Sequence, residues 1–162
     1  MRSPRPMPVY SRILVPLDRS SHDRVILEHV RPLARHCGAT LVLLHVADGW
    51  VARNIVQYPL QESEEMRDDR AYLERTCREL SDEGFTADAI LACGDPAQEI
   101  MSAADRERCD LIAMASHGHR FLADMIHGSV AHVVRHRSRV PVLFVRAAAG
   151  PAGTPGTDRA RA

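Results

Sequence analysis

Residues 111–118 read Leu-Ile-Ala-Met-Ala-Ser-His-Gly, and residues 128–130 read Gly-Ser-Val. The first four residues form a continuous apolar run, which is typical of a strand buried on both faces of a parallel sheet. A helical pattern begins at about Ser129, so the chain passes from a buried strand through a glycine-containing loop into a helix. Glycine lets the backbone approach an anion closely, and the first N–H groups of a helix point toward it. This arrangement predicts a phosphate-binding loop at residues 118–129.

Four further apolar runs are typical of strands, and helical patterns separate all five. The strands are predicted at 12–16, 40–46, 87–92, 111–114 and 142–145, and the helices at about 23–36, 61–82, 96–108 and 129–136. Gly38 and Gly84 predict the ends of the first two helices, and Asp95 followed by Pro96 predicts the start of the third. The first helix is expected to bury one face, made of Val25, Ile26, His29, Val30 and Leu33.

The alternation of strands and helices predicts an α/β domain with a doubly wound, open, parallel five-stranded sheet and helices on both faces. The third strand alternates in polarity and is expected near an edge. Ligands of such sheets bind beyond the carboxyl ends of the strands, where the strand order reverses. We expect this domain to span residues 9–147, between a flexible N-terminus at 1–8 and a disordered C-terminal tail at 148–162. Residues 49–59 are expected to form a variable surface connector, and the alternative is a lid or an interface.

The composition excludes several classes of function. The 162 residues carry 21 acidic and 21 basic side chains, so no net charge draws the protein to nucleic acid or to a membrane surface. No apolar run approaches the ~20 residues that a membrane span requires. The chain contains no lysine, which excludes a Walker-type phosphate loop and a Schiff-base mechanism. The four cysteines form no C-x-x-C pair, and residues 1–8 contain no apolar signal-peptide stretch. We therefore expect reduced cysteines and a cytoplasmic location.

Asp18 ends the first predicted strand, in the sequence Val-Pro-Leu-Asp at residues 15–18. A carboxylate at the carboxyl end of a central strand could accept a hydrogen bond from a ribose hydroxyl or an adenine amino group, or help to hold Mg²⁺. The alternative is that Asp18 caps the following helix. Because Ser20, Ser21 and Asp23 can also cap that helix, capping does not require Asp18.

Other polar clusters predict no chemistry. His132 and His136 have a spacing that can bind metal, but no carboxylate or cysteine completes the set, so we expect surface histidines and no metal site. Asp68 and Asp69 lie in a charged helix and are expected to form a solvated face rather than an acid–base pair. There is no G-x-S-x-G nucleophile motif. We therefore predict no catalytic residue.

Four motifs in this order resemble those of the universal stress protein family. They are Val-Pro-Leu-Asp at 15–18, Gly-Asp-Pro at 94–96, Ala-x2-Gly-x9-Gly-Ser at 115–129, and Pro-Val-Leu-Phe-Val-Arg at 141–146. The resemblance implies a Rossmann-like sheet of order 3-2-1-4-5 and a homodimer formed through the final strand. In nucleotide-binding members it implies ATP above the point where the strand order reverses. By position, it implies a nucleotide-binding set of Pro16, Asp18, Val46, Met114, Ala115, Gly118, Gly128, Ser129 and Val130.

Ala115 departs from the family motif, which has glycine at this position. If the site needs a positive φ, a Cβ atom costs ~1–2 kcal/mol. If the ligand approaches closely, the methyl group collides with it. If φ is ordinary and the ligand lies a methyl's width away, nothing is lost.

The function expected from these observations is an adenine-nucleotide (ATP)-binding regulator or sensor of a stress response. Its ligand would be ATP, alone or with Mg²⁺, and it would have at most slow ATP hydrolysis. The alternative is a dimeric protein-interaction module of the same fold with a degenerate pocket that binds no nucleotide. An adenylating enzyme is a third class, but the chain lacks its S-G-G-x-D-S loop.

Overall fold

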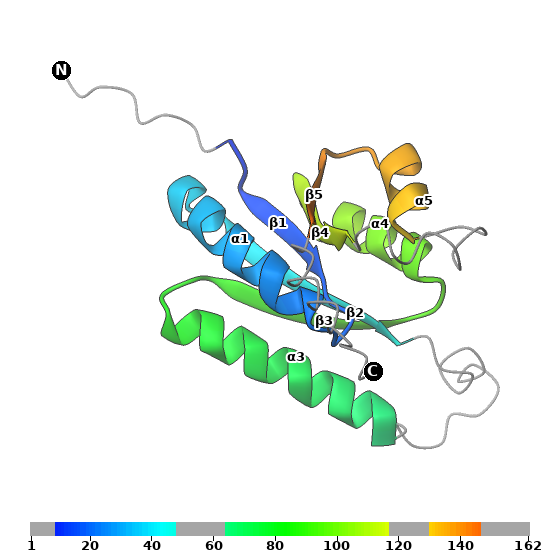
Figure 1. Cartoon of the computed structure of the whole chain (residues 1–162), viewed down its shortest axis with the longest axis horizontal. Coiled ribbons are helices and arrows are strands. Elements are labelled where there is room, and N and C mark those ends of the chain that lie inside the picture. Colours follow the sequence, from blue (N-terminus) through cyan, green and yellow to red (C-terminus); the bar gives the residue numbers. More distant parts are fainter. Residues whose placement is uncertain (1–8, 48–63, 117–129, 147–162) are drawn as a thin grey trace, which may run out of the picture.

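The computed structural model describes residues 9–47, 64–116 and 130–146. The strands are β1 (Arg12–Pro16), β2 (Thr40–Ala47), β3 (Ala87–Cys93), β4 (Leu111–Ser116) and β5 (Val142–Arg146). The helices are α1 (His22–Cys37), α3 (Glu64–Asp82), α4 (Pro96–Arg106) and α5 (Val130–Arg137). The strands pair in parallel in the order β3-β2-β1-β4-β5 (Figure 1). The predicted doubly wound α/β fold and its strand order are confirmed.

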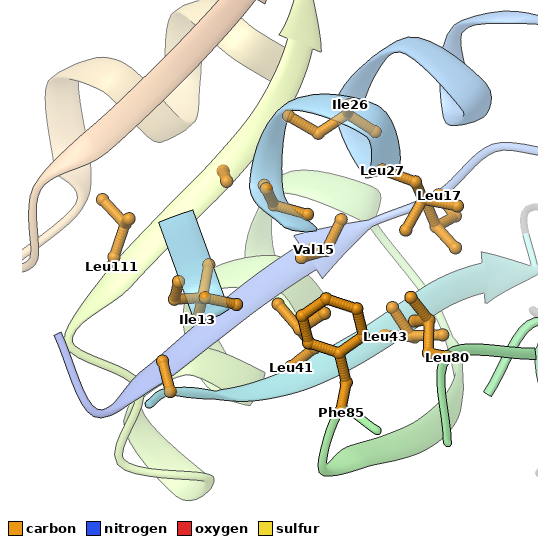
Figure 2. Packing of buried hydrophobic residues seen from close by; sticks show 14 of the residues in the cluster. Ile13, Val15, Leu17, Ile26, Leu27, Leu41, Leu43, Leu80, Phe85 and Leu111 are labelled. Atoms are coloured by element: carbon orange, nitrogen blue, oxygen red, sulfur yellow. The ribbon is translucent and has the colours of Figure 1, made fainter. Parts of the chain in front are cut away.

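Buried side chains lie on both faces of the sheet, because successive residues of a strand point to opposite faces. On β1, Ile13 and Val15 pack against α1 and α3, whereas Leu14 packs against α4 and α5. Figure 2 shows the cluster beneath α1 and α3, in which Phe85 and Leu80 pack with side chains of β1 and β2. We call this the first cluster, and the one beneath α4 and α5 the second cluster. Burial on both faces explains why the central strands are continuously apolar.

The predicted helix boundaries are borne out where local chemistry sets them. Gly38 ends α1 with φ 66°, and Gly84 follows α3 with φ 89°, both in the left-handed region that glycine adopts without strain. The Asp95 side chain accepts a hydrogen bond from the Gln98 N–H at 2.9 Å and so caps α4.

The buried face of α1 differs from the predicted one. His29 is exposed, and the buried residues are Asp23, Ile26, Leu27, Val30 and Ala34. These residues follow a helical spacing that begins at Asp23. Ile26 and Val30 are buried as predicted and Leu33 packs against the first cluster, so the prediction is wrong for His29 and missed Asp23, Leu27 and Ala34.

All four cysteines are free, as predicted. Burial raises the pKa of the Cys109 thiol to about 11, so this thiol is an unreactive core group near neutral pH. Among the described helices, none combines the length and apolar character that a bilayer span requires. The expected flexible N-terminus, the connector at 49–59 and the C-terminal tail lie outside the described residues.

Candidate functional site

The carboxyl ends of β1, β2 and β4 meet at one edge of the sheet. Pro16 pairs with Leu44, and the Leu17 N–H donates to the Leu44 carbonyl at 2.8 Å just beyond β1. Val46 and Met114 both pack in the second cluster, so they lie on the face covered by α4 and α5. By strand alternation Pro16 shares this face, because it follows Leu14 of the same cluster by two residues. Three predicted site residues therefore form an apolar floor at this edge.

Val130 begins α5 and also packs against the second cluster, which places the start of this helix on the same face. Helix α5 connects β4 to β5, and these strands are parallel, so the helix runs back from the carboxyl edge. The remaining predicted phosphate-binding residues, Gly118, Gly128 and Ser129, lie outside the described residues.

Ala115 belongs to β4, which runs two residues further than the sequence predicted. It pairs with Val145, and its side chain packs against the first cluster, on the opposite face from Met114. Among the described non-glycine residues, positive φ occurs at Arg19 and Arg108, so Ala115 has ordinary strand backbone. The strain considered for its Cβ atom is therefore absent, and only the distance between its methyl group and a ligand still matters.

Asp18 is exposed on the loop between β1 and α1. Its Oδ1 accepts a hydrogen bond from the Ser20 N–H at 3.0 Å, a local turn that aspartate commonly makes. The N-cap of α1 is Ser21 rather than Asp18. The capping alternative is therefore not what the structure shows, and the carboxylate lies at the carboxyl edge of a central strand.

Asp23 holds the backbone of this loop from inside the protein. It is 5% exposed, and its carboxylate accepts hydrogen bonds from the N–H groups of Asp18 at 3.0 Å and Arg19 at 2.8 Å. The Tyr72 hydroxyl of α3 donates to the same carboxylate at 2.7 Å. Arg19 has φ 63°, a left-handed conformation that costs a residue with a Cβ ~1–2 kcal/mol. The hydrogen bonds that Asp23 accepts hold the backbone in this strained form.

Asp69 of α3 forms a second buried link to the loop. Its side chain is 5% exposed and contacts Nη1 of Arg19 at 2.6 Å and Nε2 of His45 at 3.4 Å. The Nδ1 atom of His45 lies 2.8 Å from the Leu17 carbonyl. Because a carbonyl only accepts, Nδ1 carries the proton of this hydrogen bond. One buried carboxylate thus connects the loop to both β2 and α3.

The prediction that Asp69 lies on a solvated face is wrong. Charged neighbours suggested exposure, but Asp69 shares a buried stripe of α3 with Met66, Leu73, Thr76 and Leu80. This helical spacing was readable in the sequence and would have placed Asp69 inward. The partner could not be read in this way, because Arg19 lies fifty residues earlier in the chain.

Burial raises the pKa of the Asp23 carboxyl, and hydrogen bonds from Tyr72 and the Asp18 backbone oppose this shift only in part. Burial and the bond to Asp23 also raise the pKa of Tyr72. The tyrosine hydroxyl therefore keeps its proton near neutral pH and remains the donor of the pair.

We expect the Asp23→Asn variant to change the pH dependence of stability. Below the ordinary aspartate pKa of 3.8, Asp23 is protonated in both the folded and the unfolded chain. As pH rises through the raised native pKa, the unfolded chain releases its proton first, so wild type loses stability relative to the variant. Urea unfolding of both proteins between about pH 3 and pH 7 measures this difference. If the unfolding free energy of wild type instead rises relative to that of the variant with increasing pH, the raised pKa of Asp23 is contradicted.

Two other features lie outside the predicted nucleotide-binding residues. His132 and His136 are exposed on α5 with ring centroids 4.4 Å apart, and the described residues contain no group of three or more potential metal ligands. A hollow of about 230 Å³ lies between the end of α4 and the segment entering β5, at the amino edge of the sheet. It is lined by Met101, Ala104, Asp105, Arg137, Ser138, Arg139 and Val140. It is separate from the predicted nucleotide site.

The strand order reverses at β1 and β4, with helices on both faces, which defines a Rossmann-like α/β protein with its ligand edge at the strand carboxyl ends. The family model described as "Universal stress protein family" matches residues 9–146. The chain belongs to the universal stress protein family.

Individual relatives cover the same region. Universal stress protein YxiE of Bacillus subtilis is 32% identical over 148 residues, covering 85% of this chain and all of the relative. The solved structure of MJ0577, a universal stress protein of Methanocaldococcus jannaschii, has a TM-score of 0.71 and 31% identity over 85% of this chain and 96% of that one. A universal stress protein of Archaeoglobus fulgidus, solved in complex with dAMP, has a TM-score of 0.62 and 21% identity over 84% of this chain and 98% of that one.

Proposed function

We propose that this protein binds an adenine nucleotide, ATP alone or with Mg²⁺, at the carboxyl edge of β1, β2 and β4. The observation that carries the proposal is the apolar floor of Pro16, Val46 and Met114 beside the exposed carboxylate of Asp18. An apolar surface with a few convergent polar groups is the usual form of a small-molecule site. The dAMP complex of the Archaeoglobus fulgidus relative supports an adenine nucleotide as the ligand.

Each group has a distinct role in this proposal. The floor packs against the adenine ring, and Asp18 accepts a hydrogen bond from the ribose or from the adenine amino group. Gly118, Gly128 and Ser129, with the first N–H groups of α5, hold the phosphates, as their sequence pattern predicts. These roles use binding groups without a general base, so any hydrolysis of ATP is slow.

Family membership supports a role in a stress response, with the nucleotide acting as a signal. We further propose that the protein is cytoplasmic and forms a homodimer through β5, an edge strand of the sheet. Its partners would then include neither nucleic acid nor a membrane, in keeping with its balanced charge.

The second candidate is a protein-interaction module of the same fold that binds no nucleotide. The observation that favours it is Ala115, which adds a methyl group where the family motif has glycine.

The two candidates differ in whether the purified protein carries a bound nucleotide. Protein purified without added nucleotide, then denatured, should release ATP or another adenine nucleotide into the supernatant. A supernatant without nucleotide, together with no thermal shift at millimolar ATP, favours the interaction module.

We expect the Ala115→Gly variant to change ATP affinity by less than about threefold, equivalent to ~0.7 kcal/mol. The methyl group packs against the first cluster and imposes no left-handed strain, so its removal relieves nothing. Glycine within a strand should lower stability by about 0.5–1 kcal/mol. Calorimetric titration and urea unfolding measure the two effects. A gain in affinity above tenfold would show that the methyl group obstructs the ligand.

A further inference from the structure

The loop between β1 and α1 is bound by side chains at three consecutive residues. The Leu17 carbonyl lies within hydrogen-bonding distance of His45, and the N–H groups of Asp18 and Arg19 both donate to Asp23. These contacts come from β2 and α1 and leave the backbone of residues 17–19 little freedom. The Asp18 carboxylate, the proposed ligand group, stands on this fixed segment.

Helix α3 contacts this segment through two separate links. Asp69 binds the Arg19 side chain at 2.6 Å, and Tyr72 donates to Asp23 at 2.7 Å. Asp69 and Tyr72 are three residues apart, so they lie on neighbouring positions of one helix face. One link therefore holds the loop by its side chain, and the other supports the carboxylate that holds its backbone.

The backbone conformation of Arg19 indicates that these contacts hold the loop in a strained form. An arginine in the left-handed region persists only where its surroundings hold it, and such residues are concentrated at ligand sites. The Asp69 carboxylate is buried whereas the Arg19 side chain is 41% exposed, so water screens their bond from the Arg19 side only. Asp23 also accepts a hydrogen bond from the Arg19 N–H.

We propose that Asp69 and Tyr72 are positioning residues, through which α3 fixes the loop at residues 17–20 and thereby sets the affinity of the nucleotide site. This inference rests on the proposed function, because the fixed loop carries Asp18. Under this proposal, a change that moves α3 relative to the sheet also moves the Asp18 carboxylate and so alters the affinity for nucleotide. Neither residue touches the nucleotide in this scheme.

The test uses the full chain with Tyr72→Phe, which removes one hydroxyl, and Asp69→Asn, which removes one charge. Two readouts are taken: amide NMR shifts and hydrogen exchange of Asp18, Arg19 and Ser20 without nucleotide, and the Kd for ATP. We expect exchange at Asp18 and Arg19 to accelerate about tenfold. We expect ATP binding to weaken about three- to tenfold for Tyr72→Phe and somewhat more for Asp69→Asn.

Three controls separate positioning from general destabilisation. Asp82→Asn makes the same charge change at the exposed end of α3, and Tyr10→Phe removes a hydroxyl from a half-buried tyrosine at the other end of β1. Leu80→Val lowers stability through the buried part of α3, about two turns beyond Tyr72. All three should leave the loop amides and the Kd within about twofold of wild type.

The outcomes distinguish this inference from the proposed function. If the amide shifts and exchange rates of the loop stay the same in Asp69→Asn and Tyr72→Phe, the inference is overturned, whatever the affinity. It is also overturned if these amide properties change while the Kd for ATP stays constant. If wild type binds no nucleotide, the proposed function fails and the control of affinity fails with it, while the amides still decide whether α3 fixes the loop.

Discussion

Replacing Asp18 by alanine is expected to weaken ATP binding about 10- to 100-fold, which corresponds to losing a charge-assisted hydrogen bond worth about 1.5–3 kcal/mol. Asp18 is exposed, so the protein core does not depend on its side chain. The hydrogen bond that its side chain accepts from the Ser20 N–H is local. The substitution should therefore change the unfolding free energy by less than about 1 kcal/mol.

The Asp18→Asn variant separates the two roles of this side chain. Asparagine keeps an oxygen that can accept from the Ser20 N–H, so the turn is retained while the negative charge is lost. We expect Asp18→Asn to weaken binding nearly as much as Asp18→Ala. The matched control is Asp105→Ala, which removes an exposed carboxylate at the amino edge of the sheet. Equal affinity in wild type and Asp18→Ala, measured by calorimetry, would remove Asp18 from the site.

Replacing Leu44 by alanine should destabilise the protein by about 2–5 kcal/mol, the usual cost of emptying a fully buried leucine site. Leu44 has no exposed surface and lies on β2 between Pro16 of β1 and Ile90 of β3. For a domain of this size the melting temperature should fall by roughly 4–20 °C. Urea unfolding gives the free energy directly, and differential scanning calorimetry gives the temperature.

The control for this prediction is Leu91→Ala, on the edge strand β3. Leu91 is only partly buried, so truncating it opens a smaller cavity and should cost about half as much or less. The comparison tests the sheet order, since β2 is an inner strand and β3 an outer one. Equal losses from the two substitutions would contradict that placement.

The fold could be predicted from the sequence because its signals are local. Continuous apolar runs marked the strands buried on both faces, and Gly38, Gly84 and Asp95 marked helix ends by their own chemistry. The strand order itself came from resemblance to a family rather than from periodicity. The end of β4 was placed two residues short because pairing with β5, which is distant in sequence, extends it to Ser116.

The candidate site was predicted only in its outline. The edge of the sheet followed from the parallel topology, whereas Pro16, Val46 and Met114 were assigned to it by resemblance to the family. The polar network behind Asp18 could not be predicted in this way, because its links to α3 and β2 join residues far apart in sequence. Tyr72 and Asp23 are 49 residues apart, and Arg19 and Asp69 are 50 apart. Buried polar pairs of this kind are set by packing between elements, which no local pattern encodes.

Titration of the purified protein with Mg-ATP in a calorimeter tests the central claim most directly. The account predicts saturable binding of one nucleotide per chain, weakened at least tenfold by Asp18→Ala and unchanged by Asp105→Ala. The absence of heat and of any thermal shift at millimolar ATP, in wild type and in Ala115→Gly alike, would contradict it.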